Sequence, residues 1–369
     1  SSGLKALEAP ADQVAKLDRP FLQGISTERR RRALGDSGRN HPDSWSWSDV
    51  TSHALALVYG TSPAEVDSRV TRLAGELSPG WEVLHELNIS LPSHGREPFG
   101  FRDGIARTRI DWDKSTRDQP GIDTLPPGEV LLGHRNAVEL TPDVPPLASN
   151  GSMLVARQLD QDVEGFWRFW LETAEGDSEI ALRLTSKAMG RWPNGMPIRG
   201  GEPGSEPEAD EATILAGPEF ENDPHGEHTP KGSHVRRANP RDTLHADPAD
   251  SRAIVALHRI HRRGRMYGPP APRDWYPKPL RAALPAQDDA MGSRGLLFIS
   301  LCGDLSRQFE FVQQSWITNP KFANLPGVHN PGDLRRSWRA IPPPRRECQG
   351  LGDRQGWRVL PAPGQARDS

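Results

Sequence analysis

Cysteine is scarce in this chain of 369 residues, which contains only Cys302 and Cys348. Two thiols are too few for a disulfide framework or for a metal site with four thiolate ligands. Long apolar runs are missing as well, because no stretch approaches the ~18 consecutive apolar residues of a membrane span. An excess of one charge is also lacking, since 46 Lys and Arg nearly balance 49 Asp and Glu. The composition therefore argues against a membrane span and gives no reason to expect a nucleic-acid partner.

The start of the chain lacks an initiator methionine and the basic-then-apolar pattern of an export signal. We expect the front of the protein to be missing here, so a cytoplasmic and an exported protein remain open alternatives. The basic run at residues 29–32 is local. Because no recognisable nucleic-acid-binding module accompanies it, we interpret this run as a solvated helix face.

Proline and glycine are abundant, with 36 and 35 residues, which predicts many loops. The chain is nevertheless long enough to bury a sizeable core. A stretch rich in both residue types, at 120–148, separates two regions that each mix strand and helix patterns. We therefore predict an N-terminal half at residues 1–148 and a C-terminal half at residues 149–369.

The first region has the pattern of a strand, a helix and a returning strand. Its apolar residues predict strands at 53–59 and 81–87. Between them, Ser62 and Glu65 form a capping box with proline at the first helical position. The helix that follows has apolar residues at helical spacing: Val66, Val70, Leu73 and Leu77.

The second region repeats this pattern, with a strand predicted at residues 152–159 and then a helix. We attribute the apolar face of that helix to core packing; it comprises Val163, Phe166, Trp167, Trp170 and Leu171. Residues 195–229 are polar and without periodicity, so we predict a long surface loop there. Its His225 and His228 lack the further ligands that a metal site needs.

The rest of the second region contains a buried strand, a helix and a weak last strand. The strands are predicted at residues 296–302 and 356–360. The helix places four apolar residues on one face: Leu305, Phe309, Val312 and Trp316. This order of elements favours an α+β fold, with antiparallel sheets that have helices on one side.

Three separated segments have the residue types of a ligand site. Residues 98–107, PFGFRDGIAR, place Asp103 close to two glycines, and an acid held in such a tight loop can face a ligand directly. Residues 232–242 are GSHVRRANPRD, and residues 261–268 are HRRGRMYG. Together and in this order, the three segments resemble the haem-binding motifs of dye-decolorizing peroxidases. The resemblance extends to further blocks at residues 127–133, 150–157, 190–195 and 308–316.

The resemblance implies a pair of ferredoxin-like halves, each a βαββαβ unit with an antiparallel sheet, as in dimeric α+β barrels. The family begins with a strand, a helix and a strand that should precede Ser1, so we expect an incomplete first half. It also implies one haem b per chain, held mainly by the second half.

The same comparison implies roles for three residues at the haem. His234 would be the axial ligand of the iron, and an acidic partner would make its imidazole more electron-rich. Asp103 would pass a proton between the two peroxide oxygens, while Arg262 would stabilise the negative charge that develops. Without the other motifs, Asp103 is better explained as a helix cap or turn acid, and Arg262 as an ordinary charge at a strand end.

Further residues complete the cofactor-binding set that the resemblance implies. Leu296 and Phe298 would narrow the distal side of the haem, although core packing explains them equally well. Gly104 adjoins the catalytic acid, and Arg236 or Arg241 would pair with a haem propionate. The match puts the partner of the axial ligand at Asn330, which is not an acid, so Asp333 nearby is an alternative and Glu310 a less favoured one.

The function implied is a haem peroxidase that uses hydrogen peroxide to oxidise dyes, phenolics or similar reducing substrates by way of a ferryl intermediate. Bulky reductants cannot enter a pocket sized for peroxide, so electrons should travel through aromatic side chains, with Trp275, Tyr276 and Tyr267 as candidates. The alternative is a degenerate or fragmentary protein that binds haem or handles its iron with little peroxidase turnover. A homo-oligomer is an expectation at the level of the family.

Overall fold

The computed structural model describes residues 8–45, 53–78, 80–90, 95–112, 122–198, 206–269 and 294–325, together with Leu4 and residues 357–358. Several predicted residues lie outside these ranges: Trp275, Tyr276, Asn330 and Asp333. Of the predicted strand at 356–360, residues 357 and 358 are described.

The described elements are helices and a mainly antiparallel sheet, the combination typical of an α+β fold. The α-helices are α2 (Ala11–Val14), α3 (Arg19–Gln23), α4 (Glu28–Leu34), α5 (Pro63–Leu77), α6 (Val163–Thr173), α7 (Ser178–Met189), α8 (Glu211–Ala216), α9 (His234–Ala238) and α10 (Pro248–Ala256). Two consecutive π-helical segments are η8 (Ser306–Glu310) and η9 (Val312–Ile317). Short 3-10 turns are η1 (Gly38–Asn40), η2 (Pro42–Ser44), η4 (Pro127–Glu129), η5 (Pro146–Ala148) and η10 (Phe322–Asn324).

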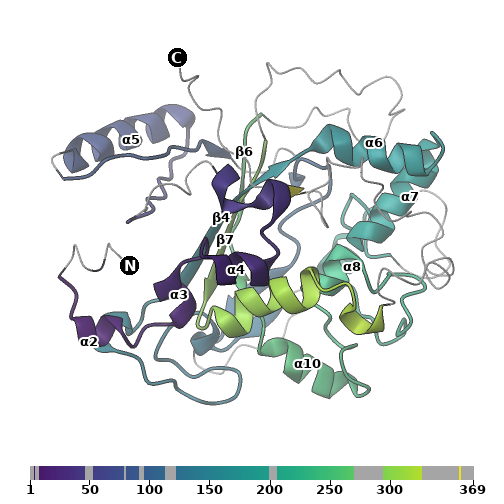
Figure 1. Ribbon diagram of the computed structural model, residues 1–369. Helices are drawn as coiled ribbons and strands as arrows, with labels where there is room; N and C mark the ends of the chain where they lie inside the picture. Colours follow the sequence, from purple (N-terminus) through teal and green to yellow (C-terminus); the bar gives the residue numbers. More distant parts are fainter. Residues whose placement is uncertain are drawn as a thin grey trace.

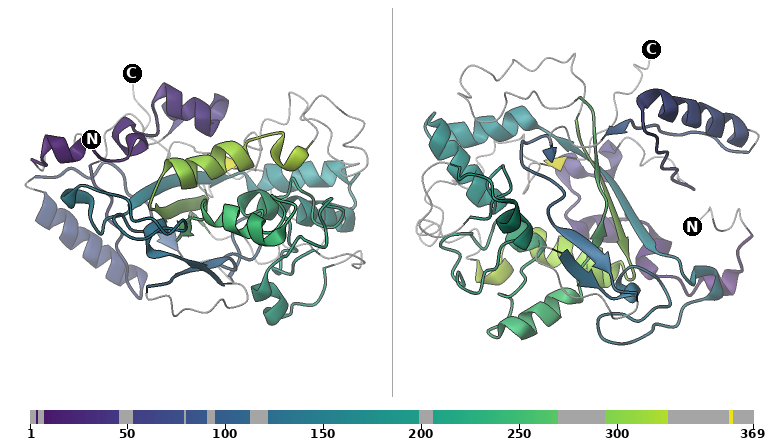
Figure 2. Two further views of the ribbon diagram at one scale, coloured as in Figure 1. Left: turned by 90° about the horizontal axis from the view of Figure 1, so that it is seen from below. Right: turned by 180° about the vertical axis from the view of Figure 1, so that it is seen from behind.

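The strands form one antiparallel sheet and one separate parallel pair. They are β1 (Ile89–Ser90), β2 (Arg107–Ile110), β3 (Ile122–Leu125), β4 (Met153–Gln161), β5 (His261–Arg262), β6 (Arg265–Tyr267), β7 (Gly295–Cys302) and β8 (Trp357–Arg358). The large sheet has the order β1-β6-β7-β4-β8, with β5 also paired to β7, whereas β2 and β3 pair with each other. Figures 1 and 2 show α4 and the π-helix on one face of this sheet and the β2–β3 pair on the other.

β4 and β7 are the long central strands, and their register assigns side chains to the two faces of the sheet. Met153 pairs with Cys302 and Val155 with Ser300, and partners in an antiparallel pair share a face. Met153, Val155 and Cys302 are buried against Leu34 of α4 and against residues of η8. We call this side the helix face of the sheet. It confirms the buried strands predicted at 152–159 and 296–302.

β7 begins at a glycine because another backbone passes very close to it. A Cβ atom on Gly295 would lie 1.9 Å from the carbonyl oxygen of Leu159 on β4. Any other residue would therefore push the two strands apart where β7 begins.

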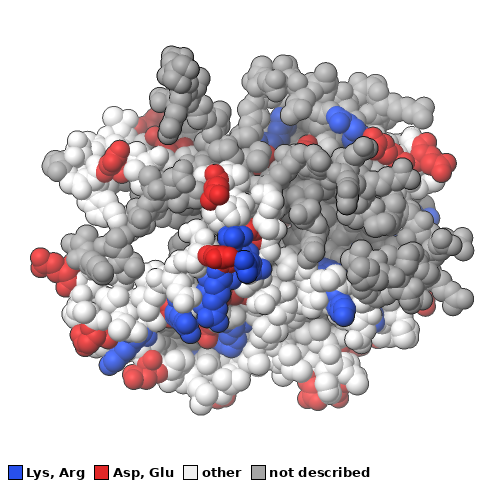
Figure 3. All heavy atoms as spheres, in the orientation of Figure 1, with Lys and Arg blue, Asp and Glu red and all other residues white. Residues whose placement is uncertain are grey.

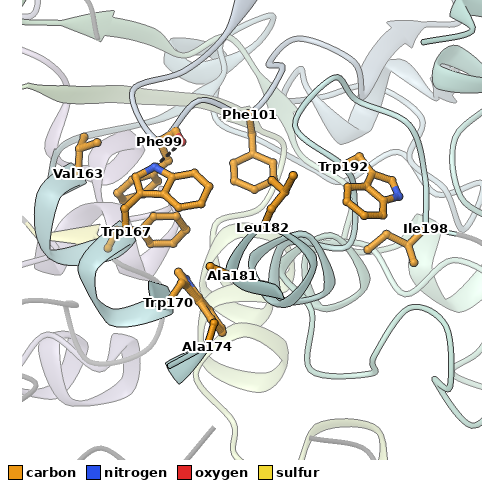
Figure 4. Packing of buried hydrophobic residues seen from close by; sticks show 11 residues of the cluster. Phe99, Phe101, Val163, Trp167, Trp170, Ala174, Ala181, Leu182, Trp192 and Ile198 are labelled. Atoms are coloured by element: carbon orange, nitrogen blue, oxygen red, sulfur yellow. Dashed lines mark hydrogen bonds between the residues drawn. The ribbon is translucent and has the colours of Figure 1, made fainter. Parts of the chain in front are cut away.

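The aromatic helix α6 forms the largest buried apolar cluster, which Figure 4 shows from close by. Phe166, Trp167 and Trp170 are 2–5% exposed, so the prediction of a core-packing face is confirmed. Phe99 stacks on Phe166 with ring centroids 4.2 Å apart, and Trp167 Nε1 donates a hydrogen bond of 3.1 Å to the carbonyl oxygen of Phe99. This helix therefore fixes the backbone just before the predicted acidic loop.

The π-helix confirms the helix predicted after residue 302. The four apolar residues predicted on one face are each at most 9% exposed: Leu305, Phe309, Val312 and Trp316. Leu305 and Phe309 pack on the helix face of the sheet, and Val312 and Trp316 join a further cluster with Val255 of α10.

The first region departs from the predicted strand, helix and strand. Helix α5 begins at Pro63 as expected, and Ser62 Oγ accepts the N–H of Glu65 at 3.3 Å. The predictions of strands at 53–59 and 81–87 are wrong, because neither segment pairs with a strand in the described part of the chain. Helix α5 has no buried residue, and Figure 1 shows it standing apart from the sheet. An apolar pattern makes a strand only where a hydrogen-bonding partner is available.

The polar segment at 195–229 contributes more to the interior than a surface loop does. It contains α8, and Ile214, Phe220 and Thr229 are each at most 2% exposed. Such isolated apolar residues have no periodicity that a sequence pattern detects.

Candidate haem site

His234 is the first residue of α9, which is held against the π-helix. Arg237, one turn further on, donates hydrogen bonds to the carbonyl oxygens of Trp316 at 2.7 Å and Asn319 at 2.8 Å. The half-buried imidazole of His234 makes no hydrogen bond in the part of the chain that is described. Burial, and secondarily the charge of Arg262, lower the pKa of His234 to about 4. The ring is therefore neutral near pH 7, with a nitrogen lone pair available to a metal.

Arg262 lies on the helix face of the sheet. It pairs with Ser300 across β5 and β7, so its side chain shares that face with Phe298 and Leu296, two and four residues before Ser300. Arg262 is exposed, and its charge acts on His234 although the two residues lie on different elements. The fold therefore brings the charge of a guanidinium to act on an imidazole that lies 28 positions earlier in the sequence.

Leu296 and Phe298 are half-buried on this face. Phe298 packs near Phe309 of the π-helix, with ring centroids 6.0 Å apart. Phe298 thus has a packing role, and the two side chains give the face beside Arg262 an apolar character.

Asp103 is exposed in a loop whose backbone glycines permit a tight turn. Gly100 has a φ of 97° and Gly104 a φ of 74°, values that residues with a side chain rarely adopt. The N–H of Asp103 donates to the carbonyl oxygen of Gly95 at 3.0 Å. A Cβ atom added to Gly104 would meet nothing within 4 Å, so open space adjoins the acid.

Two anchors tie the Asp103 loop to the sheet that carries Arg262. On one side, Gln161 at the end of β4 donates to the carboxylate of Glu97 at 2.7 Å. On the other side, Thr108 Oγ1 lies 2.7 Å from Nδ1 of His261, the neighbour of Arg262. Glu97 is absent from the residues predicted from the motifs, although an acid directly before an apolar pair was a usable signal.

Arg236 makes contacts within the protein that speak against the predicted pairing with a haem propionate. Its side chain is 2% exposed and donates to the carbonyl oxygens of Thr229 and Asp223, both at 2.8 Å. It also forms an ion pair with the Asp223 carboxylate at 3.4 Å and lies over the Phe220 ring at 4.7 Å. Buried arginines are rare unless paired, and these contacts engage both terminal nitrogens of the guanidinium.

Arg241 has a different environment that suits the predicted role. Its buried Nε has no hydrogen-bond partner. Burial and then the charge of Arg241 lower the pKa of Arg191 to about 10, so two guanidinium groups lie close together. An anionic carboxylate would satisfy the unpaired Nε and offset this repulsion.

Two further predicted residues make side-chain contacts within the fold. Glu310 forms an ion pair with Arg30 of α4 rather than with the imidazole of His234. Tyr267 is 4% exposed and donates to Asp160 Oδ1 at 3.3 Å. It also lies on the opposite face of the sheet from Arg262, because it pairs with Gly295.

The basic run at 29–32 is only partly the solvated helix face that we predict. Figure 3 shows basic side chains gathered near the centre of the face that carries α4, with acidic side chains among them. Arg32 is 71% exposed and pairs with Glu28 at 2.5 Å. Arg30, in contrast, is 12% exposed and joins α4 to the π-helix through Glu310.

Over the described ranges there is no cluster of three or more His, Cys, Asp or Glu that could hold a bare metal ion. The described helices are also either too short or too polar to cross a membrane.

Comparison with known proteins gives similar sequences and similar structures. The chain is 28% identical to Peroxidase 2 of Mycetinis scorodonius over 301 residues, which cover 79% of this chain and 56% of that protein. It is 30% identical to the multifunctional dye peroxidase DyP2 of an Amycolatopsis species over 256 residues, or 64% of this chain and 49% of that protein. No model of a protein family matches the chain.

The structural similarity covers more of the chain. An ancestral D-type dye-decolorizing peroxidase has a TM-score of 0.70 at 26% identity, over 87% of this chain and 69% of its own. The dye-decolorizing peroxidase of Auricularia auricula-judae has a TM-score of 0.65 at 25% identity, over 87% and 70%. The chain spans only 53–62% of the length of three curated relatives.

These likenesses define an α+β protein with the fold of a haem peroxidase family. The chain is a distant homologue of the dye-decolorizing peroxidases, with similarity over most of its own length.

Proposed function

We propose that this protein is a haem-dependent peroxidase that reduces hydrogen peroxide and oxidises dyes, phenolics or similar reducing substrates. The observation that carries the proposal is the environment of His234: its half-buried imidazole makes no hydrogen bond in the described ranges, and burial together with the charge of Arg262 lowers its pKa. Bound haem b supplies the iron that takes electrons from such a reductant and passes them to peroxide.

The residues present fit one haem. His234 would hold the iron, because its lone pair is not taken up by a proton or by a neighbouring donor. Arg241 would bind a propionate through its unpaired Nε. Leu296 and Phe298 would border the macrocycle, and Gly104 would leave room for it.

Asp103 and Arg262 would act on the peroxide. The Asp103 carboxylate would accept a proton from one peroxide oxygen and deliver it to the other, so that water leaves. The Arg262 guanidinium would stabilise the negative charge that develops as the bond between the oxygens breaks. Its exposure leaves it free to face a small ligand.

We also propose that the second half is a ferredoxin-like unit and the first an incomplete one. The order β4, α6, β6, β7, π-helix and β8 supports this reading of the second half, because it follows the βαββαβ pattern. The sheet order β6-β7-β4-β8 places the first and third strands of the pattern at its centre. In the first half, α5 and β1 are the described elements that would belong to an incomplete βαββαβ unit.

The experiment is a haem titration of the purified chain followed in the Soret region. We expect a high-spin ferric Soret band at one haem per chain, and a change of that band after one equivalent of hydrogen peroxide. His234→Ala should weaken haem retention, whereas the matched variant His225→Ala, in the 195–229 segment, should bind as the parent does. Equal retention in parent and His234→Ala would contradict the assignment of the ligand.

A haem-binding protein with little turnover is the second candidate. The pairing of Glu310 with Arg30 favours it, because that contact withdraws one acid that could polarise His234. In the same titration this function would give the Soret band of bound haem but no change on adding peroxide.

A further inference from the structure

Glu97 stands at the start of the Asp103 loop and is 7% exposed. Its carboxylate accepts three hydrogen bonds: from the N–H of Phe101 at 2.9 Å, the N–H of Phe99 at 3.0 Å and the side-chain amide of Gln161 at 2.7 Å. Two of these donors belong to the loop itself, and the third belongs to the end of β4. One carboxyl group therefore joins the loop to the central sheet.

The backbone of Glu97 closes the same turn. Its N–H donates to the carbonyl oxygen of Phe101 at 2.9 Å, and its own carbonyl oxygen accepts the N–H of Gly100 at 2.8 Å. The turn then continues to Asp103, whose side chain is exposed. Because glycines with positive φ precede and follow Asp103, the loop has little stiffness of its own and depends on such contacts.

We propose that Glu97 is a positioning residue, whose carboxyl group holds the loop of residues 97–103 in shape and thereby sets where the Asp103 carboxylate stands. Any effect of Glu97 on peroxide chemistry rests on the role proposed above for Asp103. The hydrogen bonds by which Glu97 fixes the loop, in contrast, do not depend on haem and can be tested without it.

The protonation of Glu97 gives this contact a pH dependence. Burial raises the pKa of Glu97 to about 7, in spite of the hydrogen bonds from Gln161, Phe99 and Phe101. Asp103 is the charged group among those that act on it, and its charge raises the pKa further. An open loop would return Glu97 to water and to its ordinary pKa. The closed loop therefore binds the proton more tightly, and a rise of pH through 7 favours opening.

Amide hydrogen exchange of the haem-free chain tests the hold directly. In Glu97→Ala, exchange at residues 99–101 should become at least about tenfold faster, because each lost hydrogen bond contributes about 1 kcal/mol. Glu97→Gln keeps one acceptor oxygen but turns an amide nitrogen toward an N–H donor, so its exchange should lie between the parent and Glu97→Ala. Because it cannot ionise, it should also lose the pH dependence between pH 6 and 8. Glu129→Ala removes another fully buried glutamate, which accepts the N–H of Ala137, and should leave these amides unchanged.

Unchanged protection of residues 99–101 in Glu97→Ala would overturn the proposal. If that variant does not fold, Gln161→Leu decides instead, since it removes the donor on β4 without touching the loop. Faster exchange at residues 99–101 then supports the proposal, and unchanged exchange overturns it.

Kinetics of the haem-loaded protein separate positioning from a general loss of structure. Glu97→Ala should slow the reaction with peroxide in the parent, yet add no further loss in an Asp103→Asn background. The same fold-loss in both backgrounds would show that Glu97 does not act through Asp103. If the loaded parent does not react with peroxide at all, the proposed function fails, while the exchange measurement still decides what Glu97 does.

Discussion

Two arginines five positions apart, Arg236 and Arg241, have the same side chain and opposite surroundings. Arg236 is enclosed by Asp223, Thr229 and Phe220, whereas the Nε of Arg241 is buried without a partner. An unpaired buried donor is unfavourable unless a ligand satisfies it. One residue therefore serves the fold, and the other is suited to an anion.

Alanine substitutions should separate these two roles. Arg236→Ala leaves the mostly buried Asp223 carboxylate without its cation, so the free energy of unfolding should fall by about 3–5 kcal/mol. Arg241→Ala should change stability less and weaken haem uptake instead. Urea unfolding and haem titration of both variants check this. Similar stability losses together with unaltered haem uptake in Arg241→Ala would refute the division.

Asp103 is the residue with the clearest kinetic prediction. Asp103→Asn keeps the size of the side chain but cannot take up the proton, so haem should bind as in the parent. The reaction with peroxide should become about 100- to 10,000-fold slower, the usual contribution of a positioned acid–base group. Stopped-flow measurement of the Soret change tests it. Asp143→Asn, also exposed, is the matched control, and equal rates in all three proteins would remove the role of Asp103.

At the scale of elements, α6 is the helix that links the core to the predicted site. Its Trp167 donates to the backbone of the Asp103 loop, whereas the Nε1 of its neighbour Trp170, one turn on, is buried without a partner. Both rings are at most 5% exposed. They provide a natural comparison between packing alone and packing plus a hydrogen bond.

Phenylalanine at each tryptophan isolates that hydrogen bond. Both Trp167→Phe and Trp170→Phe remove part of a buried ring, but only Trp167→Phe breaks a hydrogen bond. It should therefore lower the free energy of unfolding by about 1 kcal/mol more than Trp170→Phe does. Urea midpoints of the two variants measure the difference. Equal or reversed midpoints would show that the contact with the Phe99 carbonyl does not stabilise the loop.

The elements that the sequence predicts correctly are those with enough apolar residues to be buried against one another. β4, β7, α6 and the π-helix have dense apolar patterns and pack on one another. The segments at 53–59 and 81–87 have a similar local pattern, yet no strand lies beside them in the described ranges. Strand formation is a property of a pair of segments, so a pattern in one segment is insufficient.

At the scale of the whole molecule, Glu97 should make stability depend on pH. Its pKa is about 7 in the folded chain and 4.5 when solvated, so the folded state binds the proton more tightly between these values. The contribution of Glu97 to the free energy of unfolding is therefore fully present below pH 4.5 and is lost as the pH rises through 7. Relative to Glu97→Gln, the parent should lose about 3 kcal/mol of unfolding free energy over that window, at 1.36 kcal/mol per pKa unit.

Urea unfolding of both proteins from pH 4 to 8 provides the measurement. A constant difference between the parent and Glu97→Gln across this range would mean that Glu97 titrates at its ordinary pKa.

The site shows how far the motifs reach. His234, Arg262 and Asp103 are predicted because their flanking residues resemble those of a family, and the comparisons find distant homologues of the chain in that family. A motif predicts neither the burial of Arg236 nor the hydrogen bonds that the Glu97 carboxylate accepts from the loop. Both depend on segments far away in sequence, such as Gln161 on β4 for Glu97.

The sequence by itself determined the α+β class, the central strands, the aromatic helix and the family, because these depend on local periodicity and on contiguous motifs. Only the tertiary structure decided which charged residues are buried, which are paired, and which face the sheet beside His234. The physical reason is that the energy of a charge depends on its solvation and on its neighbours, and both are set by residues brought together from distant parts of the chain.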